Sequence, residues 1–222
     1  MRPCFRLPAS RSLAQAFAQQ QFVVVHHFLP AGITREWAAA ADRLSRQYGT
    51  SIRREGRDRL AYTVVPGDII RDHWPDLYGF YASDDVRAWV RQVTGAPAIF
   101  TSAHLASAIN INRLETTDHA YRWHYDATPF TLLIYLTDSA PDAGGALQVE
   151  PPHGAIIDVQ PTRGMAVLMD GTVVRHRVAP IQRAELRLSI PLVYPATPEH
   201  HRPPGLDEYL YASEDIEIAK KR

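Results

Sequence analysis

The chain of 222 residues has a single cysteine, Cys4, and no apolar run that approaches the roughly 20 residues of a membrane-spanning helix. One cysteine excludes an intramolecular disulfide and fits a reducing compartment. The N-terminal region also has no continuous apolar stretch like that of a secretory signal. These absences lead us to expect a cytoplasmic protein for which no membrane is a partner.

Net charge is lacking as well, because 24 basic residues balance 24 acidic ones. Nucleic acids and acidic membranes attract proteins that carry a basic patch or a positive net charge. The balance therefore predicts no nucleic-acid partner and favours a small molecule instead. No feature of the sequence indicates an oligomeric state.

What is present suits one globular domain, since apolar residues make up 45% of the chain. The patterns predict helices at 12–20, 34–47 and 83–93, with caps at Thr34 and Ser83, and a strand at 22–28. Short strands separated by Pro and Gly turns follow from residue 99 to 194. Because no linker or repeat divides the chain, we expect one domain, 1–222. It would comprise a helical support and possible lid (1–98), a β core (99–194) and a tail (195–222).

The most informative motif is His124-Tyr125-Asp126, followed further along the chain by His176. Residues i and i+2 of a strand point to the same side, so His124 and Asp126 can reach one metal from a single strand. The segment 172–180 alternates like a strand and places His176 on its apolar face. Two imidazoles and one carboxylate are the donor set that holds non-haem Fe(II) on one face of its octahedron. The alternative is a β-barrel in which His124 and Asp126 form an ordinary hydrogen-bonded pair.

Arg187 lies in a strand expected at 185–194, where aliphatic residues occupy one face and Arg187 and Ser189 share the other. A buried guanidinium without an anionic partner is very costly. Its planar fork suits a carboxylate, with the Ser189 hydroxyl as a further donor. An ion pair with one of the chain's own 24 acidic residues is the alternative.

Two amides, Asn110 and Asn112, fall on one face of a strand expected at 107–114, opposite Ile109 and Ile111. They would look into a polar pocket. The alternative is that they lie on the solvent face of an antiparallel sheet.

Taken together, His124-x-Asp126, His176 in the run His-Arg-Val-Ala-Pro, and Arg187-x-Ser189 resemble the Fe(II)/2-oxoglutarate-dependent dioxygenases. Further matches are Tyr135 in Leu-Ile-Tyr-Leu-Thr, the Gly144-Gly145-Ala-Leu turn, and Gly164-Met-Ala-Val-Leu-Met-Asp. The run from Ile109 to Asp126 looks closest to a small branch of free-amino-acid hydroxylases and radical halogenases.

The resemblance implies a mainly β fold with flanking helices (α+β), the double-stranded β-helix, which is a cupin-like jelly roll with iron at its open end. It also implies Fe(II), the co-substrate 2-oxoglutarate, and O2. By resemblance, the iron ligands are His124, Asp126 and His176.

The same resemblance assigns the distal carboxylate of 2-oxoglutarate to Arg187 and Ser189, with the Tyr135 hydroxyl alongside. For Tyr135 the alternative is a core aromatic with a satisfied hydroxyl. Asn112 is a fourth candidate contact for this co-substrate, because it shares the expected polar pocket.

We expect the enzyme to oxidise, most simply to hydroxylate, a C–H bond of a small amino-acid-like metabolite while 2-oxoglutarate is decarboxylated to succinate. Halogenating members of the branch lack the carboxylate ligand and bind a halide in its place, so Asp126 favours oxygen insertion. The alternatives are desaturation or ring closure in secondary metabolism, halogenation, iron chemistry without 2-oxoglutarate, and a non-catalytic cupin-like binding module.

Candidates for substrate contact are less well defined. The arginine-rich segment 51–60 predicts a solvated loop, or else a lid whose arginines capture a substrate carboxylate. On the second interpretation Arg53, Arg54 and the nearby Arg71 would contact the substrate. Tyr121, beside the first metal ligand, and Asn110 complete the set.

Overall fold

The computed structural model describes residues 5–54, 60–117, 119–198 and 204–206. The strands are β1 (Phe22–Val25), β2 (Thr50–Arg54), β3 (Leu60–Val65), β4 (Ile111–Leu114), β5 (Tyr121–His124), β6 (Phe130–Tyr135), β7 (Leu147–Glu150), β8 (Ile157–Val159), β9 (Ala166–Asp170), β10 (Arg175–Val178) and β11 (Arg187–Tyr194). The helices are α1 (Arg11–Gln20), α2 (Ala31–Tyr48), α3 (Gly67–His73), α4 (Pro75–Tyr81), α5 (Asp84–Thr94), α6 (Leu105–Ala108) and the 3-10 turn η1 (Pro141–Ala143).

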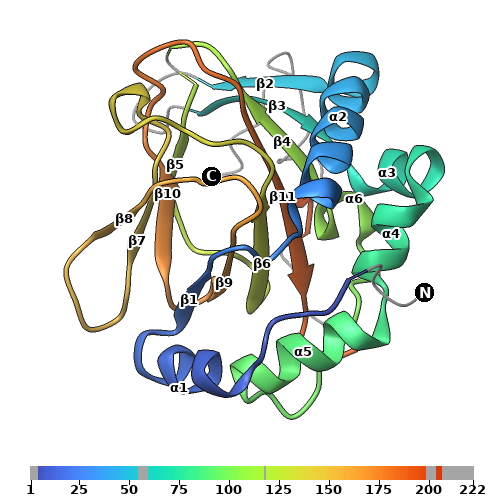
Figure 1. Cartoon of the computed structure of the whole chain (residues 1–222), viewed down its shortest axis with the longest axis vertical. Helices are drawn as coiled ribbons and strands as arrows, with labels where there is room; N and C mark the ends of the chain where they lie inside the picture. The colour runs from blue at the N-terminus through green and yellow to red at the C-terminus, as the bar shows by residue number, and fades with distance from the viewer. Residues whose placement is uncertain (1–4, 55–59, 118, 199–203, 207–222) are drawn as a thin grey trace.

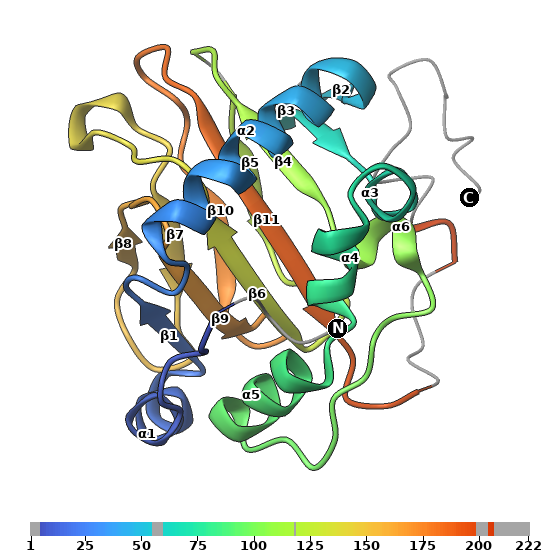
Figure 2. The same ribbon diagram turned by 45° about the vertical axis from the view of Figure 1, so that its right-hand side comes forward.

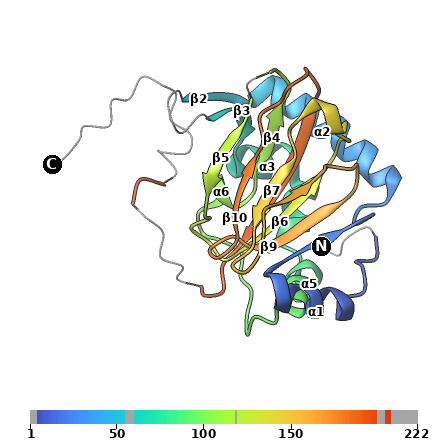
Figure 3. The same ribbon diagram turned by 90° about the vertical axis from the view of Figure 1, so that its left-hand side faces the viewer.

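Two antiparallel sheets make up the core. The larger has seven strands in the order β1-β9-β6-β11-β4-β3-β2, and the smaller has four in the order β5-β10-β7-β8. Figure 1 shows the smaller sheet on the left beside the larger one, and Figure 3 turns the smaller sheet toward the viewer. This is the double-stranded β-helix with flanking helices, so the fold expected from the sequence is confirmed.

Alternation along β11 divides its side chains between two layers. Leu188, Ile190 and Leu192 pack into the core cluster that also holds Trp37 and Leu44 of α2. The helix α2 lies across this outer face of the large sheet (Figure 2). The intervening residues of β11 therefore face the smaller sheet, where a polar cavity can form.

A second apolar layer fills part of the space between the two sheets. Leu133 and Met169 of the large sheet share a cluster with Leu147 and Val149 of the smaller one. This layer holds the two sheets together, and Leu133, Leu147 and Met169 also form part of the cavity wall.

Helix α5 confirms its predicted buried stripe, Val86, Trp89, Val90 and Val93, and its predicted end at Gly95, which takes the left-handed conformation. Its predicted cap is not formed: Ser83 stands directly before the first helical residue, but its hydroxyl makes no capping hydrogen bond and has no partner among the described residues. None of the described helices is long and apolar enough to cross a membrane.

Several expected boundaries were wrong. The strand expected at 22–28 ends at Val25, and His27 has a positive φ that a strand does not allow. Helix α2 begins at Ala31, and Thr34 lies inside its first turn, where its hydroxyl donates to the carbonyl of Pro30 at 3.0 Å instead of capping. The apolar pattern missed this turn because Ala31 and Gly32 are exposed. Similarly, the strand expected at 107–114 starts only at Ile111, since residues up to Ala108 form α6.

The segment 51–60 is not a simple solvated loop. Residues up to Arg54 form β2, which pairs with β3 in an antiparallel hairpin with Arg54 opposite Leu60. Residues 55–59 lie outside the described residues. Strands β1, β2 and β3 all join the large sheet, so the N-terminal part contributes strands as well as helices.

Candidate functional site

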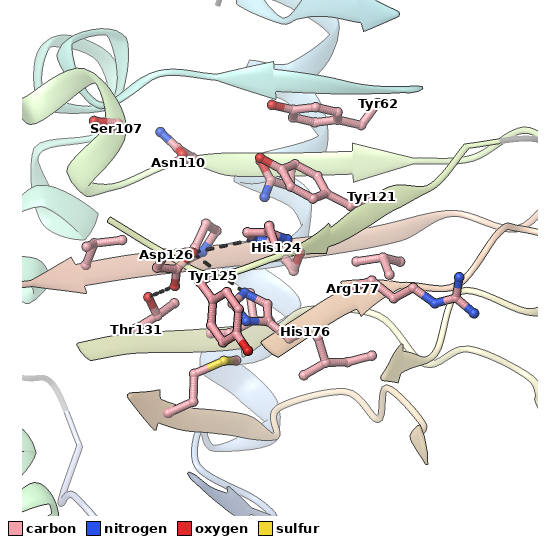
Figure 4. Close-up of a pocket in the computed structure, with 18 of the residues that line it drawn as sticks. Tyr62, Ser107, Asn110, Tyr121, His124, Tyr125, Asp126, Thr131, His176 and Arg177 are labelled. Carbon is pink, nitrogen blue, oxygen red and sulfur yellow. Dashed lines mark hydrogen bonds and ion pairs between the residues drawn. The ribbon is translucent and has the colours of Figure 1, made fainter. Parts of the chain in front are cut away.

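The three predicted metal ligands converge on one point. His124 ends β5, Asp126 follows two residues later, and His176 lies on β10, which pairs with β5 so that His176 is opposite His124. The Nε2 atoms of His124 and His176 lie 3.5 and 3.6 Å from Asp126 Oδ1. One ligand atom from each residue lies within 4.8 Å of the others. Figure 4 shows the three side chains directed toward one another.

Backbone carbonyls orient both imidazoles. The Nδ1 atom of His124 lies 2.8 Å from the Arg122 carbonyl, and that of His176 lies 3.0 Å from the Val174 carbonyl. A carbonyl can only accept, so each Nδ1 carries the proton and each Nε2 keeps a lone pair. Such a contact to the second ring nitrogen is the usual companion of a metal-binding histidine.

The charges of the cluster suit a cation. Burial by itself raises the pKa of the Asp126 carboxyl, but His176, His124 and the Thr131 hydroxyl outweigh it, and the net pKa lies well below its usual range. Burial lowers the pKa of His176. An ionised carboxylate and a neutral imidazole are the protonation states that bind metal.

A buried arginine marks the other end of the site. Arg187 is 1% exposed; its Nε donates to the Gly145 carbonyl at 2.9 Å, its Nη1 to Ser189 Oγ at 3.2 Å and its Nη2 to Tyr135 Oη at 3.4 Å. Three of the five N–H donors of the guanidinium are thus used. Among the described residues no acidic side chain pairs with it. An anionic ligand would complete its contacts.

A cavity of about 450 Å³ joins the two ends, since both the metal ligands and Arg187 line it. Ser189 and Asn112 line it too, and the buried Oδ1 of Asn112 has no hydrogen-bond partner among the described residues. Tyr135 does not line the cavity, because its ring lies behind the guanidinium of Arg187, 5.1 Å from ring centroid to Cζ. Burial raises the pKa of Tyr135 to about 12, so its hydroxyl keeps its proton.

The wall near the entrance carries neutral polar groups. Tyr62, Ser107, Asn110 and Tyr121 line the cavity, and Figure 4 shows them on one side of the three candidate ligands. The Tyr121 ring packs on His124 at 4.7 Å between centroids, and burial raises its pKa to about 12. Tyr125, at the rim, is 57% exposed.

The predicted arginines do not join this wall. Arg53 is exposed on β2, and Arg71, on α3, pairs with Asp72 at 2.8 Å. Arg54 lies on the opposite face of β2 from Arg53 and near enough to Tyr121 to affect its pKa, yet it does not line the cavity. The structure thus brings Asn110 and Tyr121 to the site, but none of the three arginines.

Sequence reasoning missed several contacts. One is the contact of Thr131, on β6, which donates its hydroxyl proton to Asp126. Tyr62 lies on β3, a strand that was not predicted, and Ser107 on α6, where a strand was expected. Gly171 gave no local signal, because its contact with Asp126 joins residues far apart along the chain.

Comparison with known proteins agrees with this geometry. The profile of the Halogenase D family matches residues 6–156, more than half of the chain. The chain belongs to the Halogenase D family. No curated protein sequence matches it significantly.

Solved structures resemble this Halogenase D family member in fold. The epimerase SnoN from nogalamycin biosynthesis, in complex with Fe3+, α-ketoglutarate and nogalamycin RO, is 18% identical, with a TM-score of 0.68 over 95% of this chain and 91% of that one. AviO1 from Streptomyces viridochromogenes is 18% identical, with a TM-score of 0.68 over 90% and 100%. A Pseudomonas putida prolyl-4-hydroxylase is 22% identical, with a TM-score of 0.64 over 83% and 97%.

The fold and the donor set agree with the expectation of a non-haem iron enzyme. Among the solved structures of similar fold, SnoN is in complex with Fe3+ and α-ketoglutarate. The halogenase family also agrees with the branch expected from the sequence.

Proposed function

We propose that the protein hydroxylates a C–H bond of a small, amino-acid-like metabolite, with decarboxylation of 2-oxoglutarate to succinate. The observation that carries the proposal is one cavity with two complementary ends. At one end two histidines and a carboxylate converge, and at the other a buried guanidinium has no acidic partner among the described residues.

His124, Asp126 and His176 would hold the iron. When bound with 2-oxoglutarate and O2, the iron supplies the oxidising power that the side chains of a protein lack. The chain's own contribution is to hold three ligands on one face, which leaves the remaining positions for the co-substrate and O2. The two carbonyl contacts to Nδ1 keep both imidazoles ready to bind.

Arg187 and Ser189 would bind the distal carboxylate of 2-oxoglutarate. The two remaining N–H donors of the guanidinium match the two carboxylate oxygens. Tyr135 would not contact the co-substrate itself, but its hydroxyl and its ring would hold the guanidinium of Arg187 in a fixed orientation. Asn112 would donate to the co-substrate, since the side-chain amide faces the cavity between the metal cluster and Arg187.

Asp126 favours hydroxylation over halogenation. Its Oδ1 lies 3.5 and 3.6 Å from the two histidine Nε2 atoms. The protein itself therefore supplies the third ligand on that face of the metal. A halide that bound there would have to displace a carboxylate ionised at neutral pH. Membership of the Halogenase D family keeps chlorination as the second candidate, and a product analysis with chloride present separates the two.

Tyr62, Ser107, Asn110 and Tyr121 would face the substrate. All four are neutral hydrogen-bonding groups, which suits a small polar metabolite whose reacting C–H bond lies toward the metal. SnoN, a protein of similar fold, was solved with nogalamycin RO, so a secondary metabolite is consistent with this fold.

Two measurements test the proposal. Anaerobic titration with Fe(II) and 2-oxoglutarate should produce a weak visible charge-transfer band, and amino acids screened with O2 should yield succinate and a product heavier by one oxygen atom. A product with chlorine in place of hydrogen would favour halogenation. A protein that gave no band and no succinate would refute the assignment, as would succinate release that survives His124→Ala or Asp126→Ala.

A further inference from the structure

The Asp126 side chain is held by two residues outside the metal cluster. Thr131 on β6 donates its hydroxyl proton to Asp126 Oδ2 at 2.6 Å. On the other side, the Asp126 backbone N–H donates to the Gly171 carbonyl at 2.8 Å. A Cβ atom at position 171 would lie 2.2 Å from Oδ2 and 2.6 Å from Cγ. The carboxylate therefore lies directly against the Cα of Gly171, in space that a side chain would fill.

The two oxygens of this carboxylate have different partners. Oδ1 lies 3.5 and 3.6 Å from the two histidine Nε2 atoms, whereas Oδ2 accepts the bond from Thr131. Figure 4 shows the Thr131 hydroxyl on one side of Asp126 and the imidazoles on the other. A carboxylate on its own rotates easily about its Cβ–Cγ bond. Here a hydrogen bond and a close backbone contact both oppose that rotation.

We infer that Thr131 and Gly171 are positioning residues that hold the Asp126 carboxylate as a ligand through Oδ1 alone. Thr131 keeps Oδ2 turned away from the metal position, and Gly171 leaves the space in which the carboxylate lies. A single oxygen ligand keeps open the coordination positions that 2-oxoglutarate and O2 need. The inference rests on the proposed function, because it requires Asp126 to bind the metal.

A purely structural role for Thr131 would leave metal affinity unchanged. The first test therefore measures Co(II) binding at equilibrium by visible absorption, and not turnover. Thr131→Val keeps the size and the β-branch but removes the donor, and Thr131→Ser keeps the donor. Loss of a contact that orients a ligand typically costs 10–100-fold in metal affinity, so Thr131→Val should bind Co(II) at least about tenfold more weakly. Thr131→Ser should bind like the wild type.

The result that overturns the inference is wild-type Co(II) affinity in Thr131→Val. Thermal unfolding of the metal-free proteins checks that all three are folded. If Thr131→Val does not fold, Thr131→Ser and Thr131→Cys replace it, because the thiol is a weak donor and should bind Co(II) with intermediate affinity. Absence of Co(II) binding by the wild type would overturn the proposed function as well, so the two failures are distinguishable.

Gly171 is tested by a double-mutant cycle that needs no metal. Gly171→Ala should lower the midpoint of thermal unfolding in the wild-type background, because the new methyl group meets the carboxylate. In the Asp126→Gly background the same change should have little effect, since Oδ2, Cγ and Cβ of residue 126, the three atoms that a Cβ at position 171 would meet, are all gone. Gly32→Ala is the matched control, because nothing lies within 4 Å of a Cβ there. Equal losses in both backgrounds would overturn the role of Gly171.

Discussion

Two regions of the cavity are built differently: the inner end around Arg187, and an entrance lined by the proposed substrate contacts. At the inner end, Tyr135, Arg187 and Ser189 project from β6 and β11, which lie in the middle of the seven-stranded sheet and are paired on both sides. At the entrance, Tyr62 comes from β3, which is also paired on both sides, Tyr121 comes from β5 at the edge of the smaller sheet, and Asn110 and Tyr125 come from segments outside the strands. The proposed co-substrate contacts are thus fixed by regular pairing, while two of the proposed substrate contacts lie outside the strands, where a chain varies more easily.

The largest effect should come from the metal ligands, on which both ends depend. His176→Ala removes a ligand from β10, and succinate release should fall by more than about 100-fold, since even changes to groups that only orient ligands cost 10–100-fold. Succinate formation with saturating 2-oxoglutarate measures this. His153→Ala, an exposed histidine, serves as the control and should retain wild-type activity. Undiminished release in His176→Ala would exclude His176 as a ligand.

Binding of 2-oxoglutarate at the inner end should be weakened most directly by a substitution of Arg187. Arg187→Lys keeps the charge but loses the planar fork, so we expect the KM for 2-oxoglutarate to rise by about 10–100-fold, equivalent to about 1.5–3 kcal/mol for a charged hydrogen bond. Steady-state kinetics with varied 2-oxoglutarate checks it. Arg183→Lys, at an exposed ion pair, should change nothing. A KM that stays constant would place the co-substrate elsewhere.

A substitution at the entrance should change the KM for the substrate and not the KM for 2-oxoglutarate. Tyr121→Phe removes a hydroxyl that faces the cavity but keeps the ring against His124. We expect the slow decarboxylation of 2-oxoglutarate without substrate to be unchanged, while the KM for the substrate rises by about tenfold, the value of one hydrogen bond. The ratio of succinate formed to oxidised substrate formed then measures how tightly decarboxylation is coupled to substrate oxidation. A change in the KM for 2-oxoglutarate instead would mean that the two ends are not separate.

A smaller effect concerns stability, through an ion cluster in which the buried Arg113 of β4 pairs with two partly exposed carboxylates, one of them on α2. Arg113, 4% exposed, donates to Asp42 and, at 2.5 Å, to Glu115. Its hydrogen bond lowers the pKa of Glu115; burial opposes the effect at Asp42, but the arginines outweigh it and the pKa is lowered there too. Carboxyls with lowered folded-state pKa values stabilise the fold above their unfolded values, near pH 4, and lose this contribution as the pH falls through the folded-state values.

Arg113→Met should therefore lower the free energy of unfolding at pH 7 by about 1–3 kcal/mol, and the difference from the wild type should shrink below about pH 4. Urea unfolding across this pH range checks both statements. Arg163→Met, which breaks an exposed pair with Asp138, should cost less than about 1 kcal/mol. A difference that stays constant to pH 3 would mean that Arg113 acts by packing alone.

Much of the metal cluster and of the inner end could be predicted, because their signals are local. The alternation that puts Arg187 and Ser189 on one face depends only on the two-residue period of a strand. The His-x-Asp spacing identified two candidate ligands, but the expectation that one strand carries both was wrong, because β5 ends at His124 and Asp126 lies beyond it. Helix α5 followed from its apolar stripe and its terminal glycine. The entrance was predicted less well, because the hairpin that carries Tyr62 has arginine-rich sequence typical of a loop.

The sequence by itself determined which side chains could bind iron and 2-oxoglutarate, and that most of them lie on the inner faces of strands, since chemical type and strand period are properties of neighbouring residues. Only the tertiary structure decided that His176 lies opposite His124, that Arg187 has no acidic partner among the described residues, and that Thr131 and Gly171 enclose Asp126. These facts depend on strand pairing and close packing between residues distant along the chain, which no local pattern specifies.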